Sequence, residues 1–113
     1  MREDGKIDYI EFPAPALASV KSFYADAFGW RFVDYGPGYA AFEEGLDGGL
    51  DGHPHEDARA PLPVIYAVDL EAMLAKVEGA GAAIVRAIYA FPGGRRFHFR
   101  DPSGNELAVW SPD

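Results

Sequence analysis

Two copies of one apolar pattern fill this chain, and this duplication restricts the fold more than any other feature. Apolar residues recur at helical spacing in both halves, at one constant offset: Leu17 and Leu70, Val20 and Met73, Tyr24 and Val77. Strand-like runs surround each helical stretch in the same order, at 7–12, 30–35, 39–43 and 48–52 in the first half and at 64–68, 82–90, 95–100 and 105–111 in the second. Each half is therefore predicted to be a βαβββ unit.

The excess of strands over helices predicts the α+β class. One helix covers only one face of its sheet, so the other faces of the two sheets must find another partner. We expect one domain over 1–113, with a first unit at about 5–52, a linker at 53–61 and a second unit at about 62–112. The two units are predicted to form a cupped, partly open mixed β-barrel around a ligand cavity.

Local signals at the ends of these elements support the assignment. Gly29 follows the first helical stretch, where a left-handed C-cap is favoured, and Asp69 precedes the second as a good N-cap. In the run FHFRDPSGNELAVWS, Asp101, Pro102 and Gly104 occupy the positions that each prefers in a type I β-turn. The glycine-bearing segment at 48–52 is predicted to be an edge-like fourth strand of the first unit.

Composition excludes several classes of function. The 113 residues include no cysteine, which rules out disulfides, thiolate catalysis and cysteine metal sites. Eighteen acidic and ten basic residues give a formal charge of -8, which disfavours binding to nucleic acid and is compatible with a cationic ligand. The charged start MREDGKID and the lack of a long apolar run predict no membrane association and a cytoplasmic location.

Three stretches resemble the vicinal oxygen chelate superfamily, which includes glyoxalase I, the bleomycin and fosfomycin resistance proteins and the extradiol dioxygenases. They are FYADAFGW at 23–30, VDLEAMLAKVEGAGA at 68–82 and FRDPSGNELAVW at 99–110. With the strands between them, the resemblance covers nearly the whole chain. It implies the fold described above and a homodimer, but the motifs are not specific for one activity.

The same resemblance implies four positions for His and Glu ligands of a divalent ion, in those members that chelate an oxygenated substrate. In this chain the positions fall on Tyr9, on Leu62 or Pro63, on Ala108 and, in the least well matched stretch, at best on Asp51. We therefore expect no metal ion at the family position and no other cofactor. The alternative metal ligands are His53 and His55, which are separated by one residue in the linker.

The resemblance implies that the Ala108 position points into the cavity, and strand alternation then indicates which other side chains share its face. Tyr9 and Glu11 share one face of the first strand, and His98 faces away from its two phenylalanine neighbours. Glu106 and Trp110 share the face of Ala108 on the last strand. The predicted cavity residues are Tyr9, Glu11, His98, Glu106, Ala108 and Trp110.

Each of these residues has a functional and a structural interpretation. An inward-facing glutamate could bind a cation or act as an acid or base, and Trp110 could stack on a ligand. Core packing is the alternative for Tyr9 and Trp110, and solvent exposure is the alternative for Glu106. Arg96 and Arg100 share the face of His98, which also makes an anionic ligand group compatible with this strand.

Two functions stay open. The first is metal-independent binding of a small organic molecule, cationic or aromatic, as in the resistance proteins that sequester a drug without altering it. The second is a lyase, isomerase or dioxygenase related to glyoxalase I, which would use a displaced metal site or Glu11 and Glu106 as acid and base. The missing ligands favour binding, but the sequence does not decide whether the protein is an enzyme and does not identify the ligand.

Overall fold

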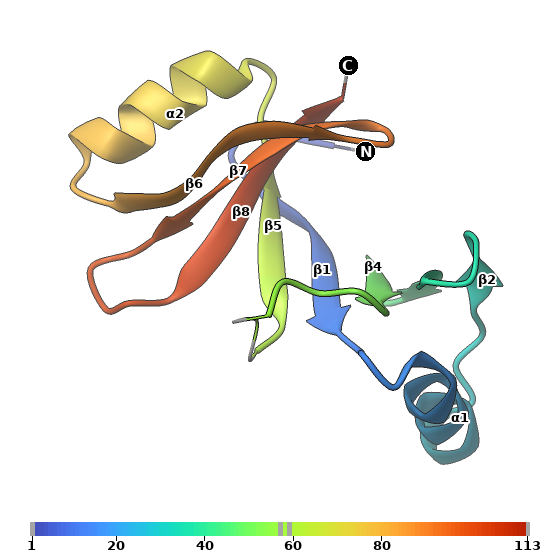
Figure 1. Cartoon of the computed structure of the whole chain (residues 1–113). Coiled ribbons are helices and arrows are strands. Elements are labelled where there is room, and N and C mark those ends of the chain that lie inside the picture. The colour runs from blue at the N-terminus through green and yellow to red at the C-terminus, as the bar shows by residue number, and fades with distance from the viewer. Residues whose placement is uncertain (1, 57, 59, 113) are drawn as a thin grey trace. The chain divides into compact units, whose positions relative to one another are not determined.

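The computed structural model describes residues 2–56, 58 and 60–112 (Figure 1). Its described residues form two helices and eight strands, which confirms the α+β class and the order strand, helix and three strands in each half. The chain divides into two compact units. We call Tyr9–Pro61 the continuous unit, and we call Met1–Asp8 together with Leu62–Asp113 the split unit. Among the residues described, no helix is long and apolar enough to cross a membrane.

The continuous unit holds most of the first βαβββ pattern. Its elements are β1 (Ile7–Pro13, which begins in the split unit), α1 (Leu17–Phe28), β2 (Val33–Asp34), β3 (Tyr39–Glu44) and β4 (Leu46–Asp51). The strand order is β2-β3-β4-β1, with β1 parallel to β4 and the other neighbours antiparallel. The prediction that β4 is edge-like is therefore wrong, because β4 pairs on both sides. Its glycines serve close packing instead: a Cβ on Gly48 would lie 2.5 Å from the Ile10 carbonyl oxygen.

An aromatic core lies under α1. The buried residues Ala14, Phe42 and Leu50 pack with partly buried side chains that include Trp30 and Phe32. These two aromatic residues belong to the predicted strand 30–35, of which only Val33–Asp34 is regular in the structure. Gly29 ends α1 with a φ of 74°, and its N–H bonds back into the last turn of the helix, as the sequence predicts.

The split unit contains β5 (Leu62–Tyr66), α2 (Leu70–Gly79), β6 (Ala83–Phe91), β7 (Gly94–Arg100) and β8 (Glu106–Pro112). Its strand order is β5-β8-β7-β6, with β5 parallel to β8 and the other neighbours antiparallel. Residues near the N-terminus complete this unit: the Gly5 N–H donates to the Tyr66 carbonyl oxygen at 2.8 Å. The helix α2 lies along one face of the sheet (Figure 1), where it contacts β7 and β8.

Two short-range predictions in the split unit are confirmed. The Asp69 side chain caps α2 by accepting a hydrogen bond from the Ala72 N–H at 3.0 Å. The turn between β7 and β8 is closed by the Gly104 N–H, which donates to the Asp101 carbonyl oxygen at 2.9 Å. Under α2 the core is formed by Ala67, Leu70, Phe97, Phe99 and Val109.

Candidate functional site

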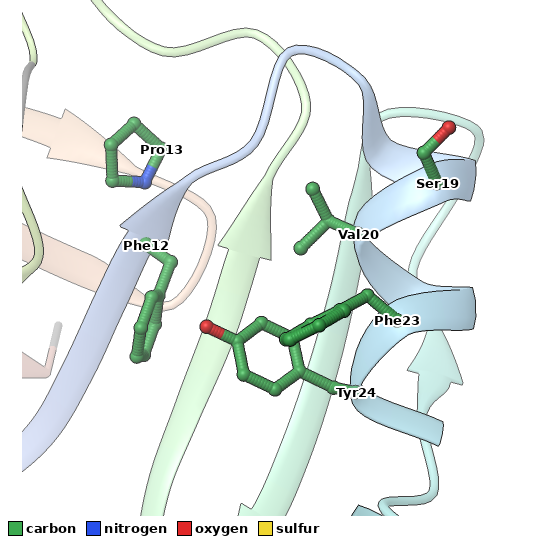
Figure 2. Close-up of a pocket in the computed structure, with 6 residues that line it drawn as sticks. All are labelled: Phe12, Pro13, Ser19, Val20, Phe23 and Tyr24. Carbon is green, nitrogen blue, oxygen red and sulfur yellow. The ribbon is translucent and has the colours of Figure 1, made fainter. Parts of the chain in front are cut away.

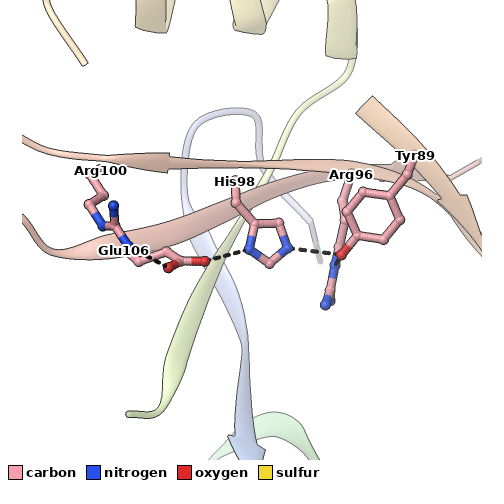
Figure 3. A network of polar contacts seen from close by, with 5 residues as sticks. All are labelled: Tyr89, Arg96, His98, Arg100 and Glu106. Carbon is pink, nitrogen blue, oxygen red and sulfur yellow. Dashed lines mark hydrogen bonds and ion pairs between the residues drawn. The ribbon is translucent and has the colours of Figure 1, made fainter. Parts of the chain in front are cut away.

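The face of the split unit's sheet opposite α2 carries a connected set of polar side chains (Figure 3). Phe97 and Phe99 pack into the core under α2, so the residues that alternate with them on β7 point to the opposite face. We call this group the polar face, and its members are Arg86, Tyr89, Arg96, His98, Arg100 and Glu106.

His98 lies at the centre of the polar face, and both of its ring nitrogens have partners. Its Nδ1 lies 2.8 Å from Glu106 Oε2, and its Nε2 lies 2.8 Å from the Tyr89 hydroxyl. Arg96 Nε also donates a hydrogen bond to the Tyr89 hydroxyl. The second carboxylate oxygen of Glu106, Oε1, lies 3.8 Å from Arg100 Nη2.

These contacts fix the direction of the hydrogen bonds. A guanidinium only donates, so the Tyr89 oxygen accepts from Arg96 and gives its single proton to His98 Nε2. The remaining imidazole proton is then on Nδ1, where it is donated to the Glu106 carboxylate. The result is a chain that runs from Arg96 through Tyr89 and His98 to Glu106.

His98 is held in its neutral form. Burial lowers the pKa of His98, and the positive charges of Arg96 and Arg86 lower it further. The hydrogen bond to Glu106 acts in the opposite direction but does not reverse the shift. With 4% of its surface exposed, the imidazole is a neutral base that is shielded from solvent.

Two guanidinium groups flank Tyr89. Arg86 Cζ lies 4.3 Å from the centre of the tyrosine ring, and Arg96 Cζ lies 5.6 Å from it. Arg96 also lies 5.5 Å from the ring of Phe91. Arginine binds carboxylates and phosphates through paired N–H groups, so this part of the face is chemically suited to an anion.

The other predicted residues of the second half share the polar face's side of the sheet. Ala108 is fully buried and is the register partner of His98. Trp110 is the register partner of Arg96, and its ring lies 5.7 Å from that of Tyr66. The Trp110 Nε1–H donates to Asp8 Oδ1 at 3.1 Å, so the N-terminal segment also holds this side chain.

Tyr9 and Glu11 belong to a separate cluster in the continuous unit. The Tyr39 hydroxyl lies 2.5 Å from the Tyr9 hydroxyl and donates to Glu11 Oε2 at 3.1 Å. Burial raises the pKa of Tyr39, and the Glu11 charge adds to the effect. Tyr39 reaches Glu11 across Gly49, where a Cβ would lie 2.0 Å from the tyrosine oxygen. The structure thus places the predicted residues in two clusters, one in each unit.

The continuous unit also contains an apolar hollow of about 310 Å³ between the end of β1 and α1 (Figure 2). Its lining consists of Phe12, Pro13, Ser19, Val20, Phe23 and Tyr24. Hydroxyl groups are the only polar side-chain groups among these residues, and none of them is charged. This hollow therefore offers shape and apolar contact but no ionic recognition.

Comparison with known proteins identifies the family. The family model of the Glyoxalase/Bleomycin resistance protein/Dioxygenase superfamily matches residues 6–109. The chain belongs to this superfamily. A comparison with curated protein sequences gave no match.

Solved structures that resemble this superfamily member support the fold. One is the structure described as an NAD-dependent benzaldehyde dehydrogenase from Legionella pneumophila, with 16% identity, 93% of this chain and 98% of that chain covered, and a TM-score of 0.76. A superfamily member from Vibrio splendidus 12B01 has 17% identity, coverages of 93% and 97%, and a TM-score of 0.69. A Mn(II)-bound glyoxalase from Novosphingobium aromaticivorans has 25% identity and a TM-score of 0.68, with 98% of this chain covering 40% of that chain.

In this chain, the residues at the metal positions that the superfamily resemblance implies do not fit a divalent ion. Ala108 has no donor atom, Leu62 and Pro63 have none in their side chains, and the Tyr9 hydroxyl is engaged by Tyr39. Among the described residues, no three His, Asp or Glu side chains gather in a group that could hold a metal. His53 and His55 are exposed in the loop after β4, and the Asp51 side chain accepts from the His53 N–H at 3.0 Å.

Sequence reasoning missed Tyr89 and Arg86, and a β-bulge explains why. Arg86 pairs with His98 and Tyr89 pairs with Arg96, so the two residues between them on β6 lie opposite a single residue on β7. Simple alternation along 82–90 places Arg86 and Tyr89 on opposite faces, whereas the bulge brings them to the same face. No signal in this stretch of sequence marks the irregularity.

Proposed function

We propose that the protein binds a small organic molecule on the polar face of the split unit, without a metal ion. The observation that carries this proposal is the pair of guanidinium groups at Tyr89, with Arg86 at 4.3 Å and Arg96 at 5.6 Å from one ring. They would hold an anionic group of the ligand, and the nearby rings of Phe91 and Trp110 would contact an aromatic part.

This proposal replaces the cationic ligand suggested by net charge with an anionic one. The formal charge of -8 is spread over the whole chain, whereas three arginines share the polar face with one glutamate. Screening by salt limits the reach of exposed charges to about 10 Å, so the local arginines dominate at this face. A cytoplasmic location and a homodimer, as expected from the sequence, belong to the same proposal.

Thermal denaturation with paired probes tests the proposal. Benzoate, phenyl phosphate and benzylamine share one ring and differ in charge, and each is added in EDTA and again with a divalent ion. A ligand at about one hundred times its dissociation constant adds about 2.7 kcal/mol to stability. We expect the two anions to raise the melting temperature in EDTA and benzylamine to have no effect.

A neighbouring arginine provides the matched control. Arg96→Gln should abolish the shift caused by the anions. Arg95→Gln should retain it, because Arg95 pairs with Glu71 of α2 across the opposite face. Stabilisation that needs the divalent ion, or that both variants lose equally, would contradict metal-independent binding at the polar face.

Acid–base catalysis is the second candidate, and the contact between Glu106 and His98 favours it. In this arrangement Glu106 accepts a hydrogen bond from the imidazole and acts through His98. Chemical conversion of a stabilising compound, followed by NMR, would distinguish an enzyme from a protein that only binds. Unchanged compound after prolonged incubation would leave binding as the function.

A further inference from the structure

We propose that Tyr89 is a proton-transfer residue, whose hydroxyl passes a proton between a molecule bound at the polar face and His98. This inference rests on the proposed function for the binding of an anionic molecule, and it adds a chemical step to it. The class of molecule concerned is a small organic anion that carries an ionisable proton.

The route of the proton follows from the positions of the two imidazole nitrogens. His98 is almost fully buried, and its Nδ1 is directed at Glu106. Its Nε2 is directed at the Tyr89 hydroxyl, which lies 2.8 Å away. A molecule on the face therefore exchanges protons with this nitrogen through the tyrosine oxygen.

The step balances without any further reactant. The bond between the ligand and its proton breaks as a new O–H bond forms at Tyr89, and the original tyrosine proton moves to His98 Nε2. The imidazole becomes a cation and the ligand gains one negative charge. The reverse movement restores both groups, so the residues act as a general acid and base.

The charges around Tyr89 and His98 favour this separation of charge. On β6 and β7, Arg86 and Arg96 lie beside the tyrosine and would stabilise the new negative charge on the ligand. On β8, Glu106 would stabilise the imidazolium, with Arg100 of β7 at its other oxygen. Glu106 is a positioning residue, because it contacts His98 and acts through it.

Reactivity of the tyrosine itself provides a test that needs no natural substrate. An arylsulfonyl fluoride is attacked by a tyrosine oxygen: an O–S bond forms, the S–F bond breaks, fluoride leaves, and the tyrosine proton must go to a base. We expect Tyr89 to react with 4-(fluorosulfonyl)benzoate at pH 7 on the order of a hundredfold faster than exposed Tyr35. Peptide mapping by mass spectrometry measures both rates in the same sample.

The pH profile separates a proton relay from simple accessibility. A phenol without a base reacts about tenfold faster for each pH unit below its ordinary pKa of about 10. With neutral His98 as the base, the rate at Tyr89 should be constant from pH 7 to 9 and should fall only in acid, where the imidazole becomes protonated. Exposed Tyr35 supplies the comparison in the same sample.

Variants and a second probe complete the experiment. His98→Gln and Glu106→Gln should both reduce the reaction rate at Tyr89 and make this rate rise with pH between 7 and 9. Arg95→Gln should change neither the rate nor its pH dependence. If His98→Gln does not fold, the profile of the unsubstituted protein decides the question by itself. A rise at Tyr89 parallel to that of Tyr35 would overturn the relay.

The neutral probe benzenesulfonyl fluoride distinguishes failure of the relay from failure of anion binding. A plateau with both probes supports the relay. A higher rate for the carboxylate probe, lost in Arg96→Gln, supports the anionic ligand. A plateau with equal rates for the two probes would retain the relay and overturn the proposed binding of anions.

Discussion

Two residues inside the units, His98 and Tyr39, have pKa values that are displaced first of all by burial. In both cases burial favours the neutral form, so the pKa of the histidine falls and that of the tyrosine rises. Each neutral side chain is then used as a hydrogen-bonding group: His98 connects Tyr89 to Glu106, and Tyr39 connects Tyr9 to Glu11. The two clusters are alike in using an uncharged group to hold a carboxylate.

The lowered pKa of His98 predicts a loss of stability in mild acid. Because the folded protein takes up this proton less readily than the unfolded chain, the contribution of His98 is complete above the ordinary value of 6.5. It is lost as the pH falls from there through the lower pKa of the folded state. Urea unfolding at pH 7.5 and 5.5 should show a smaller loss of stability in His98→Gln than in the unsubstituted protein.

The comparison uses the difference between two proteins because carboxylates also begin to titrate in this range. The contribution of carboxylates away from His98 is common to both and cancels. An equal loss of stability in the variant would mean that protonation of His98 is not coupled to unfolding.

At the scale of elements, β4 is the strand whose sequence is hardest to replace. Gly48 and Gly49 are buried in its centre, and side chains from β3 pass close to both. A methyl group on Gly48 would lie 2.5 Å from the ring of Phe42, which is closer than packed atoms allow. The strand can lie between two others because it presents no side chain at these two positions.

Alanine at two glycines should therefore have opposite effects on stability. Gly48→Ala should destabilise the protein by about 1–3 kcal/mol, because the new methyl group meets both a ring and a backbone carbonyl. Gly79→Ala at the end of α2 has open space around it and should stabilise by up to about 1 kcal/mol, since alanine favours the helix. Urea denaturation of the two variants measures both changes, and a neutral Gly48→Ala would show that β4 can shift.

The sequence predicted most elements because their signals are local. The helix periodicities, the cap at Asp69 and the turn at Asp101 each depend on a few neighbouring residues, and all three are confirmed. The strand at 30–35 was overestimated, because Trp30 and Phe32 pack under α1 and leave the ladder to Val33–Asp34. The position of β4 depends on pairing with distant strands, which alternation along one segment does not encode.

For the candidate site, too, the sequence predicts the residues on regular strands and misses those that depend on irregular or distant pairing. Alternation on regular strands put His98, Glu106 and Ala108 on one face, where the structure also has them. It does not identify Arg86, because the register shifts on both sides of this residue in β6 move it to the face opposite Ile84 and Ile88. Tyr39 was missed because its role depends on the absence of a side chain at Gly49, on the neighbouring strand.

For the whole molecule, the expected homodimer is the property most open to direct measurement. Large apolar side chains are exposed on the single chain, among them Phe23 at 58% and Phe28 at 65%. Exposed apolar surface of this kind is commonly covered by a partner. We expect size-exclusion chromatography with light scattering to give a mass twice that of one chain, independent of added metal. A monomer at high protein concentration would contradict this prediction.

The split unit joins residues from both ends of the sequence, and this has a consequence for the order of folding. The bond from Trp110 to Asp8 spans 102 positions, whereas the continuous unit contains only contacts within one stretch of chain. Closing a long loop costs more entropy than closing a short one, so distant pairings form later. The continuous unit and the segment 62–112 can each form from one stretch of chain, whereas residues near the N-terminus join the split unit only after the long loop closes. Trp30 and Trp110 lie in different units, so each reports the kinetics of one step through its own fluorescence.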